Sequence, residues 1–269
     1  MKIIRDKNKL LRLIQNDKNL GFVPTMGAIH KGHVSLIRKS IRQCNKTVIS
    51  IFINKPQFNK KSDFHKYPRV LKNDISILKD LNIDYLYLPT TKQIYPDGPN
   101  KKIKINRFEK KLCGKHRPGH FKSVVDVVDR FIKIINPKRI YFGEKDMQQL
   151  KIISDYVNNK YRNLKVVPCK TVRSKNGVAI SSRNLLLSKK ETIIASRIYN
   201  ILKNAKYKLI NKKININYIE KQINKFNIKK IEYIKVLDIN KLIKPHYSKN
   251  KYRIFISYYL GKTRLIDNI

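Results

Sequence analysis

The first two thirds of the chain alternate between short strand patterns and helical patterns. The strand patterns are apolar runs rich in β-branched or aromatic residues, whereas the helical patterns carry an apolar residue every three or four positions. Because parallel strands are usually joined by crossover helices, this alternation predicts a mostly parallel sheet with helices on both faces. The predicted strands are 20–24, 47–53, 84–88 and 139–143, and the predicted helices are 34–44, 70–81, 121–135 and 147–157.

The last part of the chain has a different order of elements. Two helical segments, 189–209 and 218–226, precede two strand-like runs at 231–237 and 252–260, and the Asn- and Lys-rich stretch 211–217 predicts a solvated loop. This order predicts a small α+β domain. We place the boundary in the polar stretch from Arg173 to Gly177, which gives domains of residues 1–174 and 175–269.

The chain is strongly basic, with a formal net charge of +43. A nucleic-acid binder usually gathers its basic residues in one patch. Here the lysines are spread over the whole length and accompany an excess of Ile and Asn, as in proteins encoded by A/T-rich genes. We therefore interpret the charge as that of a lysine-coated enzyme, with a salt-sensitive nucleic-acid binder as the alternative.

Cysteine usage and the absence of targeting patterns indicate in which cellular compartment we expect the protein. Cys44, Cys113 and Cys169 lie far apart and form no C-x-x-C pair, which argues against a disulfide framework or a zinc knuckle. The amino-terminal residues lack the apolar core of a signal peptide, and no apolar run is long enough to cross a bilayer. We expect a cytoplasmic protein without membrane association.

A glycine-bearing turn follows the first predicted strand and leads into a helix. Gly27 lies in this turn, and His30 and His33 mark the start of the helix. The carboxyl ends of strands and the amino ends of helices are where α/β folds bind phosphate, and imidazolium groups there can donate to phosphate oxygens. Two ordinary surface histidines are the alternative, and a zinc site lacks a nearby third ligand.

Polar residues also follow the later strands. Asn54 and Gln57 come after the second predicted strand and suit a substrate with hydroxyl and carboxylate groups, although an ordinary turn would also explain them. Lys145 and Gln149 follow Gly143 at the start of another helix, where a simple capped helix start is the alternative.

Two further segments carry potential anion ligands. The segment Ser181-Ser182-Arg183-Asn184 could clamp a triphosphate or form a polar linker. Arg117 and His120 precede the helix 121–135 and could add to an anion site.

Together these segments resemble the pantothenate synthetase family, the pantoate–β-alanine ligases. The resemblance runs in order from near the amino terminus to Leu187, and six motifs in register make it specific. They are Pro24-Thr25-Met26-Gly27 with His30-x-x-His33, Ser50-Ile51-Phe52-Ile53-Asn54 with Gln57-Phe58, Tyr67-Pro68-Arg69, Arg117-Pro118-Gly119-His120-Phe121, Phe142-Gly143-Glu144-Lys145-Asp146 with Gln148-Gln149, and Ser181-Ser182-Arg183-Asn184.

The resemblance implies a Rossmann-like, nucleotidylyltransferase-type sheet domain with a smaller C-terminal α+β lid domain. It implies that ATP and (R)-pantoate form pantoyl adenylate and pyrophosphate, and that β-alanine then displaces AMP to give pantothenate. Mg²⁺ is implied as the partner of ATP, without protein ligands that we can name, and a homodimer is implied as the assembly. No specific nucleic acid is implied as a partner.

The resemblance also implies roles for individual residues. His33 would be the proton-donating catalytic residue, Gln57 and Gln149 would bind pantoate, and Gln57 would also lie at the β-alanine site. The implied ATP-binding residues are Met26, Gly27, Ala28, Ile29, His30, Lys31, Gly32, His33, Gly143, Glu144, Lys145, Asp146, Val172, Ile180, Ser181, Ser182 and Arg183.

Three positions depart from the family pattern. Lys55-Pro56 stands where the family usually has Pro directly after Asn, and we expect this to re-aim the turn before Gln57. Ser123 and Asp126 replace residues that are usually Gly and Thr, so Asp126 either places a carboxylate near the phosphate region or faces solvent. A nucleotidylyltransferase that stops at transfer to a phosphate is a second rival function, and it would not require Gln57 and Gln149.

Overall fold

The computed structural model describes residues 1–211, 213–238 and 252–269, which form two compact units. The first unit comprises Met1–Glu144 and Gln148–Lys170, and the second comprises Lys145–Met147 and Thr171–Ile269. The chain thus passes from one unit to the other between Lys170 and Thr171, after a short excursion at 145–147. The division of function between residues 1–174 and 175–269 stays a prediction.

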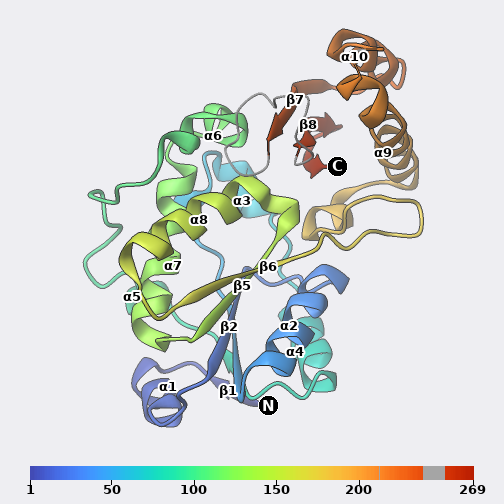
Figure 1. Ribbon diagram of the computed structural model, residues 1–269. Coiled ribbons are helices and arrows are strands. Elements are labelled where there is room, and N and C mark those ends of the chain that lie inside the picture. Colours follow the sequence, from blue (N-terminus) through green and yellow to red (C-terminus); the bar gives the residue numbers. More distant parts are fainter. Residues whose placement is uncertain (212, 239–251) are drawn as a thin grey trace. The chain divides into compact units, whose positions relative to one another are not determined.

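The first unit is built on a six-stranded parallel sheet with the order β1-β4-β3-β2-β5-β6 (Figure 1). This confirms the predicted α/β class. The strands are β1 (Lys2–Ile4), β2 (Leu20–Thr25), β3 (Lys46–Ile51), β4 (Tyr85–Tyr87), β5 (Arg139–Gly143) and β6 (Lys165–Cys169).

The strand order reverses direction between β2 and β5. The chain proceeds from β2 to β3 on one side, whereas β5 pairs with the other side of β2. Pairing between them joins Gly21 to Arg139 and Phe22 to Ile140, near the amino end of each strand, and both strands continue beyond these pairs toward Thr25 and Gly143. A reversal of this kind is where open α/β sheets bind ligands, at the carboxyl ends of the strands.

Helices cover both faces of this sheet (Figure 1). On one face, Ile37 of α2 (Lys31–Gln43) and Leu78 of α4 (Leu71–Asp80) pack against Val23 and Ile49 of the sheet. On the other face, Phe131 of α7 (His120–Ile135) packs against Phe22, and its ring also contacts the rings of two further aromatic residues. The helices of this unit are α1 (Lys7–Ile14), α2 (Lys31–Gln43), α3 (Lys61–Lys66), α4 (Leu71–Asp80), α5 (Thr91–Ile94), α6 (Leu112–His116), α7 (His120–Ile135) and α8 (Met147–Lys160), with 3₁₀ turns η1 (Lys55–Gln57), η2 (Arg107–Lys110) and η3 (Glu144–Asp146) near the strand and helix ends.

A buried carboxylate ties α7 to α8. Asp129 Oδ1 accepts hydrogen bonds from Tyr161 Oη at 2.6 Å and from Tyr156 Oη and Lys160 Nζ at 2.8 Å, and Lys133 Nζ lies 3.1 Å from Oδ2. Burial by itself would raise the pKa of Asp129, but the hydrogen bonds outweigh burial and hold the pKa below its ordinary value. The same burial and the Asp129 charge raise the pKa values of both tyrosines, so their hydroxyls stay protonated donors.

The second unit packs two helices on a three-stranded antiparallel sheet with the order β7-β8-β9. Its apolar core joins Ile198 and Leu202 of one helix, Ile219 of the other, and Ile254 and Ile256 of the central strand. The α+β class predicted for the C-terminal part is therefore confirmed. The elements are η4 (Ser182–Leu186), α9 (Lys189–Ile210), α10 (Ile216–Asn224), β7 (Lys230–Asp238), β8 (Tyr252–Leu260) and β9 (Thr263–Asn268).

Capping decides where the two helices of this unit begin. Ser188 and Glu191 exchange hydrogen bonds at the start of α9, with Ser188 N donating to Glu191 Oε2 at 2.8 Å and Glu191 N to Ser188 Oγ at 3.2 Å. Asn215 accepts from Tyr218 N at 2.9 Å, so α10 begins at Ile216. The expected loop 211–217 is therefore too long at its carboxyl end, and its residue 212 lies outside the described residues.

Candidate active site

The predicted histidine pair lies at the start of α2, directly after the turn that follows β2. His30 is the N-cap of this helix, and its Nδ1 accepts a hydrogen bond from His33 N at 3.3 Å. The two imidazole rings are stacked, with centroids 3.9 Å apart and planes 17° apart. Because Nδ1 of His30 is an acceptor, a neutral His30 carries its proton on Nε2 and donates to a ligand only from that atom.

Asp74 holds the turn between β2 and this histidine pair. Its Oδ2 accepts from Ala28 N at 2.9 Å and its Oδ1 from Ile29 N at 2.7 Å, and its side chain is 1% exposed. Gly27 and Ala28 both have positive φ, at 79° and 50°, and in this turn the N–H groups of Ala28 and Ile29 point at the Asp74 carboxylate. These two backbone donors therefore serve the protein's own carboxylate.

Asp74 was missed by the sequence reasoning. It lies in the first turn of α4, inside a helix that the sequence predicted only from its apolar spacing. A lone aspartate in a helical pattern gives no signal that it reaches back to a turn 45 residues earlier.

Gln57 ends the short 3₁₀ turn η1 after β3, and its side chain lies between Asn54 and Met26. Gln57 Oε1 accepts from Asn54 Nδ2 at 3.2 Å, and Gln57 Nε2 contacts Met26 Sδ at 3.0 Å. The structure thus brings together Met26 and Gln57, which the sequence assigned to different ligands. Asn54 is itself buried and accepts from Tyr95 Oη at 2.7 Å. Burial raises the pKa of Tyr95 far above its ordinary value, so this phenol remains a hydrogen-bond donor.

Arg117 and His120 do lie beside the predicted site, but their described contacts differ from those expected. Arg117 Nη2 donates to the main-chain oxygen of Gln57 at 3.2 Å, and His120 Nδ1 lies 2.8 Å from the same oxygen. They touch the backbone of a predicted substrate-binding residue.

We expected Asp126 either to place a carboxylate near the phosphate region or to face solvent, and the second of these alternatives is wrong. Asp126 is 3% exposed, pairs with Arg130 Nε at 2.8 Å, and accepts from Asn100 N at 2.9 Å. Arg130 also donates to the carbonyls of Ile94 and Gly98, so the carboxylate belongs to a structural network.

The first turn of α8 places two glutamines in different surroundings. Gln148 is 4% exposed and satisfies three backbone groups of the 108–113 segment, at Phe108 O, Lys111 O and Cys113 N. Gln149, a predicted pantoate ligand, is half-buried on the same turn.

Gly143 and Glu144, both predicted ATP ligands, lie at the end of β5 and the start of η3, and both are partly exposed.

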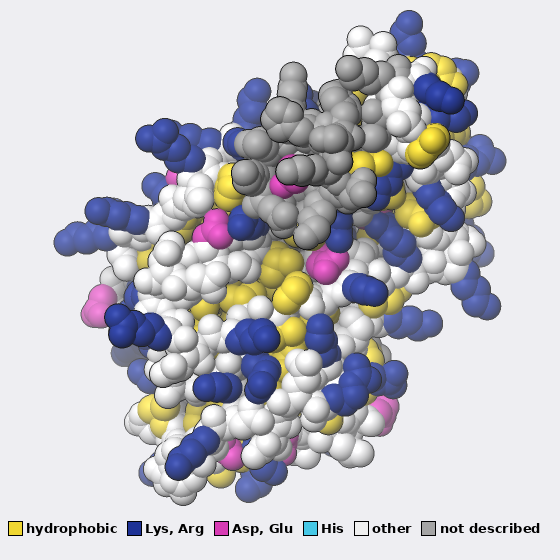
Figure 2. Space-filling model, viewed as in Figure 1, with side chains coloured by type: hydrophobic (Ala, Val, Ile, Leu, Met, Phe, Trp, Pro, Cys, Tyr) yellow, Lys and Arg dark blue, Asp and Glu magenta, His cyan; other side chains and the backbone are white. Residues whose placement is uncertain are grey.

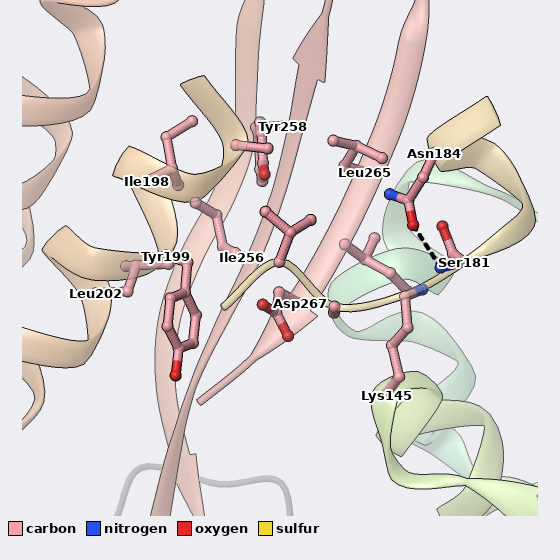
Figure 3. A pocket seen from close by; sticks show the side chains of 14 residues that line it. Lys145, Ser181, Asn184, Ile198, Tyr199, Leu202, Ile256, Tyr258, Leu265 and Asp267 are labelled. Atoms are coloured by element: carbon pink, nitrogen blue, oxygen red, sulfur yellow. Dashed lines mark hydrogen bonds between the residues drawn. The ribbon is translucent and has the colours of Figure 1, made fainter. Parts of the chain in front are cut away.

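Of the other predicted ATP residues, Lys31 and Gly32 open α2 in the first unit, and the rest lie in the second unit. Val172 and Ile180 are neighbours, because Ile180 N donates to Val172 O at 3.0 Å across a hairpin closed by Ser174 and Gly177. Ser181 N donates to Asn184 Oδ1 at 2.6 Å, which shapes η4, where Ser182 is buried and Arg183 partly exposed (Figure 3).

A small cavity in this unit borders the same turn. Lys145, Ser181 and Asn184 line it on one side, and Tyr199 and Asp267 lie among the residues on the other (Figure 3). Its volume of about 20 Å³ suits roughly one water molecule. The cavity is therefore far too small for a nucleotide.

Three features of the described residues concern possible ligands and partners: groups of metal-binding side chains, the distribution of basic side chains, and the length and polarity of the helices. Within residues 1–211, 213–238 and 252–269, no group of three or more His, Cys, Asp or Glu side chains could hold a metal ion. Lys and Arg side chains are scattered over the face shown in Figure 2, which fits the interpretation of the charge as a general coat. Among the helices that the structure describes, none is long and apolar enough to cross a membrane.

Comparison with known sequences matches one family over the whole chain. The model of the pantoate-beta-alanine ligase family matches residues 2–269. A pantothenate synthetase of Flavobacterium psychrophilum is 40% identical over 269 residues, which cover 98% of this chain and 95% of the relative. One of Sulfurihydrogenibium sp. is 39% identical over 265 residues, covering 97% of this chain and 95% of the relative.

Solved structures give the same result for the fold. A pantothenate synthetase from Thermus thermophilus superposes with a TM-score of 0.90 at 30% identity, covering 100% of this chain and 99% of that one. A pantoate-beta-alanine ligase from Francisella tularensis, complexed with beta-gamma ATP and beta-alanine, gives a TM-score of 0.88 at 37% identity, covering 100% of this chain and 97% of that one.

Proposed function

The chain belongs to the pantoate-beta-alanine ligase family, and on this premise we propose that it is an enzyme that condenses (R)-pantoate with β-alanine at the expense of ATP. The observation that carries the proposal is the family match over residues 2–269. The ligand-bound Francisella relative supports ATP and β-alanine as substrates.

In the first step, the pantoate carboxylate attacks the α-phosphorus of ATP, and the bond to pyrophosphate breaks. The product is pantoyl adenylate. No side chain acts as a nucleophile, so catalysis consists of positioning the reactants and stabilising charge on the phosphate oxygens. His33 donates to these oxygens, while His30 keeps His33 in place through the N-cap bond and the ring stack.

In the second step, the β-alanine amine attacks the acyl carbon of the adenylate. The bond from that carbon to the phosphate oxygen breaks, AMP leaves with its electron pair, and the nitrogen gives up a proton to solvent to form the amide of pantothenate. Gln149 holds the hydroxyl and carboxylate of pantoate before the first step, and Gln57 contacts pantoate and borders the β-alanine position in the second. The placement of Gln57 next to Asn54 and Met26, at the carboxyl end of β3, supports this role.

The proposal assigns ATP to the turn Met26–His33, to Gly143–Asp146, to Val172 and to Ile180–Arg183. Since two N–H groups of the first turn bind Asp74, that turn would contact ATP through its other groups. The described residues build no carboxylate or histidine cage for Mg²⁺, so we assign the ion to ATP's own phosphate oxygens and derive no step through it. We also propose a cytoplasmic homodimer, and the absence of disulfides among the three buried cysteines, all of them described, supports a reducing compartment.

The proposal is tested by AMP release from ATP, pantoate, β-alanine and magnesium, with His33→Ala alongside. We expect AMP to form only when both carbon substrates are present and to be lost in the variant. Release of pyrophosphate without free AMP, even when β-alanine is present, would favour a nucleotidylyltransferase that stops at transfer to a phosphate. Thermal protection by RNA but not by ATP would favour a nucleic-acid binder.

A further inference from the structure

Two side chains at the start of α7 contact the main-chain oxygen of Gln57: Arg117, just before the helix, and His120, its first residue. His120 Nδ1 lies 2.8 Å from this oxygen and Arg117 Nη2 lies 3.2 Å from it. Arg117 Nη1 lies 3.0 Å from His120 Nε2, so the carbonyl, the imidazole and the guanidinium close a ring of hydrogen bonds. Each side chain in this ring fixes the orientation of the other.

The ring admits one arrangement of protons. A guanidinium has donors only, so His120 Nε2 accepts from Arg117. His120 Nδ1 then carries the proton and donates to Gln57 O. His120 is 7% exposed, and both of its ring nitrogens face protein groups, so its described contacts are those of a positioning residue.

The turn that carries Gln57 needs such support. η1 is only three residues long, from Lys55 to Gln57, and Lys55 is exposed. A single 3₁₀ turn has few hydrogen bonds of its own. Further bonds fasten the same stretch to the start of α7: Asn59 Nδ2 donates to Pro118 O at 2.7 Å, and Asn54 Nδ2 donates to Ser123 O at 3.2 Å.

We propose that Arg117 and His120 are positioning residues: they hold the Gln57 amide where it can contact pantoate and β-alanine. This proposal rests on the proposed function of Gln57. We call the hydrogen-bonded ring of Arg117, His120 and the main-chain oxygen of Gln57 the clamp. The clamp holds the backbone at Gln57, and the neighbouring Asn54 and Met26 contact the two ends of the Gln57 side-chain amide. An anion-binding role for Arg117, the sequence-based alternative, would act on ATP instead. The two roles therefore differ in the substrate whose KM changes.

The experiment compares four variants of the full chain. His120→Leu removes the donor to Gln57 O, and His120→Asn restores a donor at the position of Nδ1. Arg117→Ala removes the guanidinium. Arg139→Ala is the matched control, because Arg139 also donates to a backbone carbonyl, Gln43 O, but lies at the amino end of β5, away from the carboxyl ends.

We expect His120→Leu and Arg117→Ala to raise the KM values for pantoate and β-alanine by about 10- to 100-fold, the usual effect of misplacing a substrate-orienting group. The KM for ATP should not change, His120→Asn should recover most of the loss, and Arg139→Ala should behave as wild type. Thermal unfolding of each variant, measured in parallel, separates loss of the clamp from loss of the fold.

Two results would overturn the clamp. One is a wild-type KM for pantoate and β-alanine in both His120→Leu and Arg117→Ala. The other is a rise in the KM for ATP equal to that for pantoate, which would return Arg117 to anion binding. If the wild type itself releases no AMP, the proposed function fails first and the clamp's role in catalysis fails with it.

Discussion

Removing the buried carboxylate of Asp74 tests most directly what holds the turn between β2 and α2 in place. The carboxylate accepts two backbone hydrogen bonds, from Ala28 N at 2.9 Å and from Ile29 N at 2.7 Å, and is 1% exposed. The substitution Asp74→Ala takes both acceptors away from a turn whose residues Gly27 and Ala28 have positive φ.

The expected cost follows from these contacts. A hydrogen bond to a charged group contributes about 1.5–3 kcal/mol, so two contribute roughly 3–6 kcal/mol. Removing the carboxylate also relieves the cost of burying its charge, which offsets part of this sum. We expect a net loss of about 2–4 kcal/mol in the free energy of unfolding, or a Tm lower by about 4–16 °C.

Denaturant unfolding followed by circular dichroism measures this change. Asp80→Ala is the matched control, because Asp80 lies at the end of the same helix α4 but is exposed, and we expect it to change stability by less than about 0.5 kcal/mol. Turnover by Asp74→Ala should also fall at temperatures where the variant stays folded, since the turn leads into His33. If Asp74→Ala were as stable as Asp80→Ala, the carboxylate could not be holding the turn.

Three further predictions address the two units. The folded-state pKa of Asp129 is held below its ordinary value of 3.8, so the stabilising effect of the carboxylate is complete above pH 3.8 and is lost as pH falls through the folded-state pKa. In urea melts at several pH values, the difference in stability between wild type and Asp129→Asn should therefore shrink on acidification. A difference that stays constant with pH would exclude this linkage. Gly177 has a φ of 84°, and a Cβ added there would clash with the Tyr199 ring, so Gly177→Ala should lower stability by roughly 2–4 kcal/mol. Gly98 has a φ of 74° but faces open space, so Gly98→Ala should cost only about 1 kcal/mol, and equal thermal shifts in the two variants would contradict the clash. Gln148→Met should destabilise by about 2–3 kcal/mol in denaturant melts because it deprives three backbone groups of their partner, and a wild-type melt would contradict that role.

Local pattern was sufficient for most of the regular elements. The β-branched run around Ile49 predicted β3, and the apolar spacing around Phe131 predicted α7, because burial of one face leaves a period in the sequence. Elements without that period were missed. β1 has three residues, β6 is a five-residue strand that contains Pro168, and β9 is largely polar, so each is defined mainly by its partner strand.

The sequence by itself determined the residue types of the candidate site and their order, since His30, His33, Gln57 and Gln149 all follow strand-like runs or open helices. Those local positions follow from strand and helix ends, which neighbouring residues specify. Only the tertiary structure decided what those groups touch. Asp74 reaches the turn after β2, and Arg117 and His120 grip the backbone of Gln57 across 60 and 63 residues. Such contacts depend on how distant helices pack on the sheet, and hydrogen bonds between residues so far apart leave no periodic signal in a single sequence.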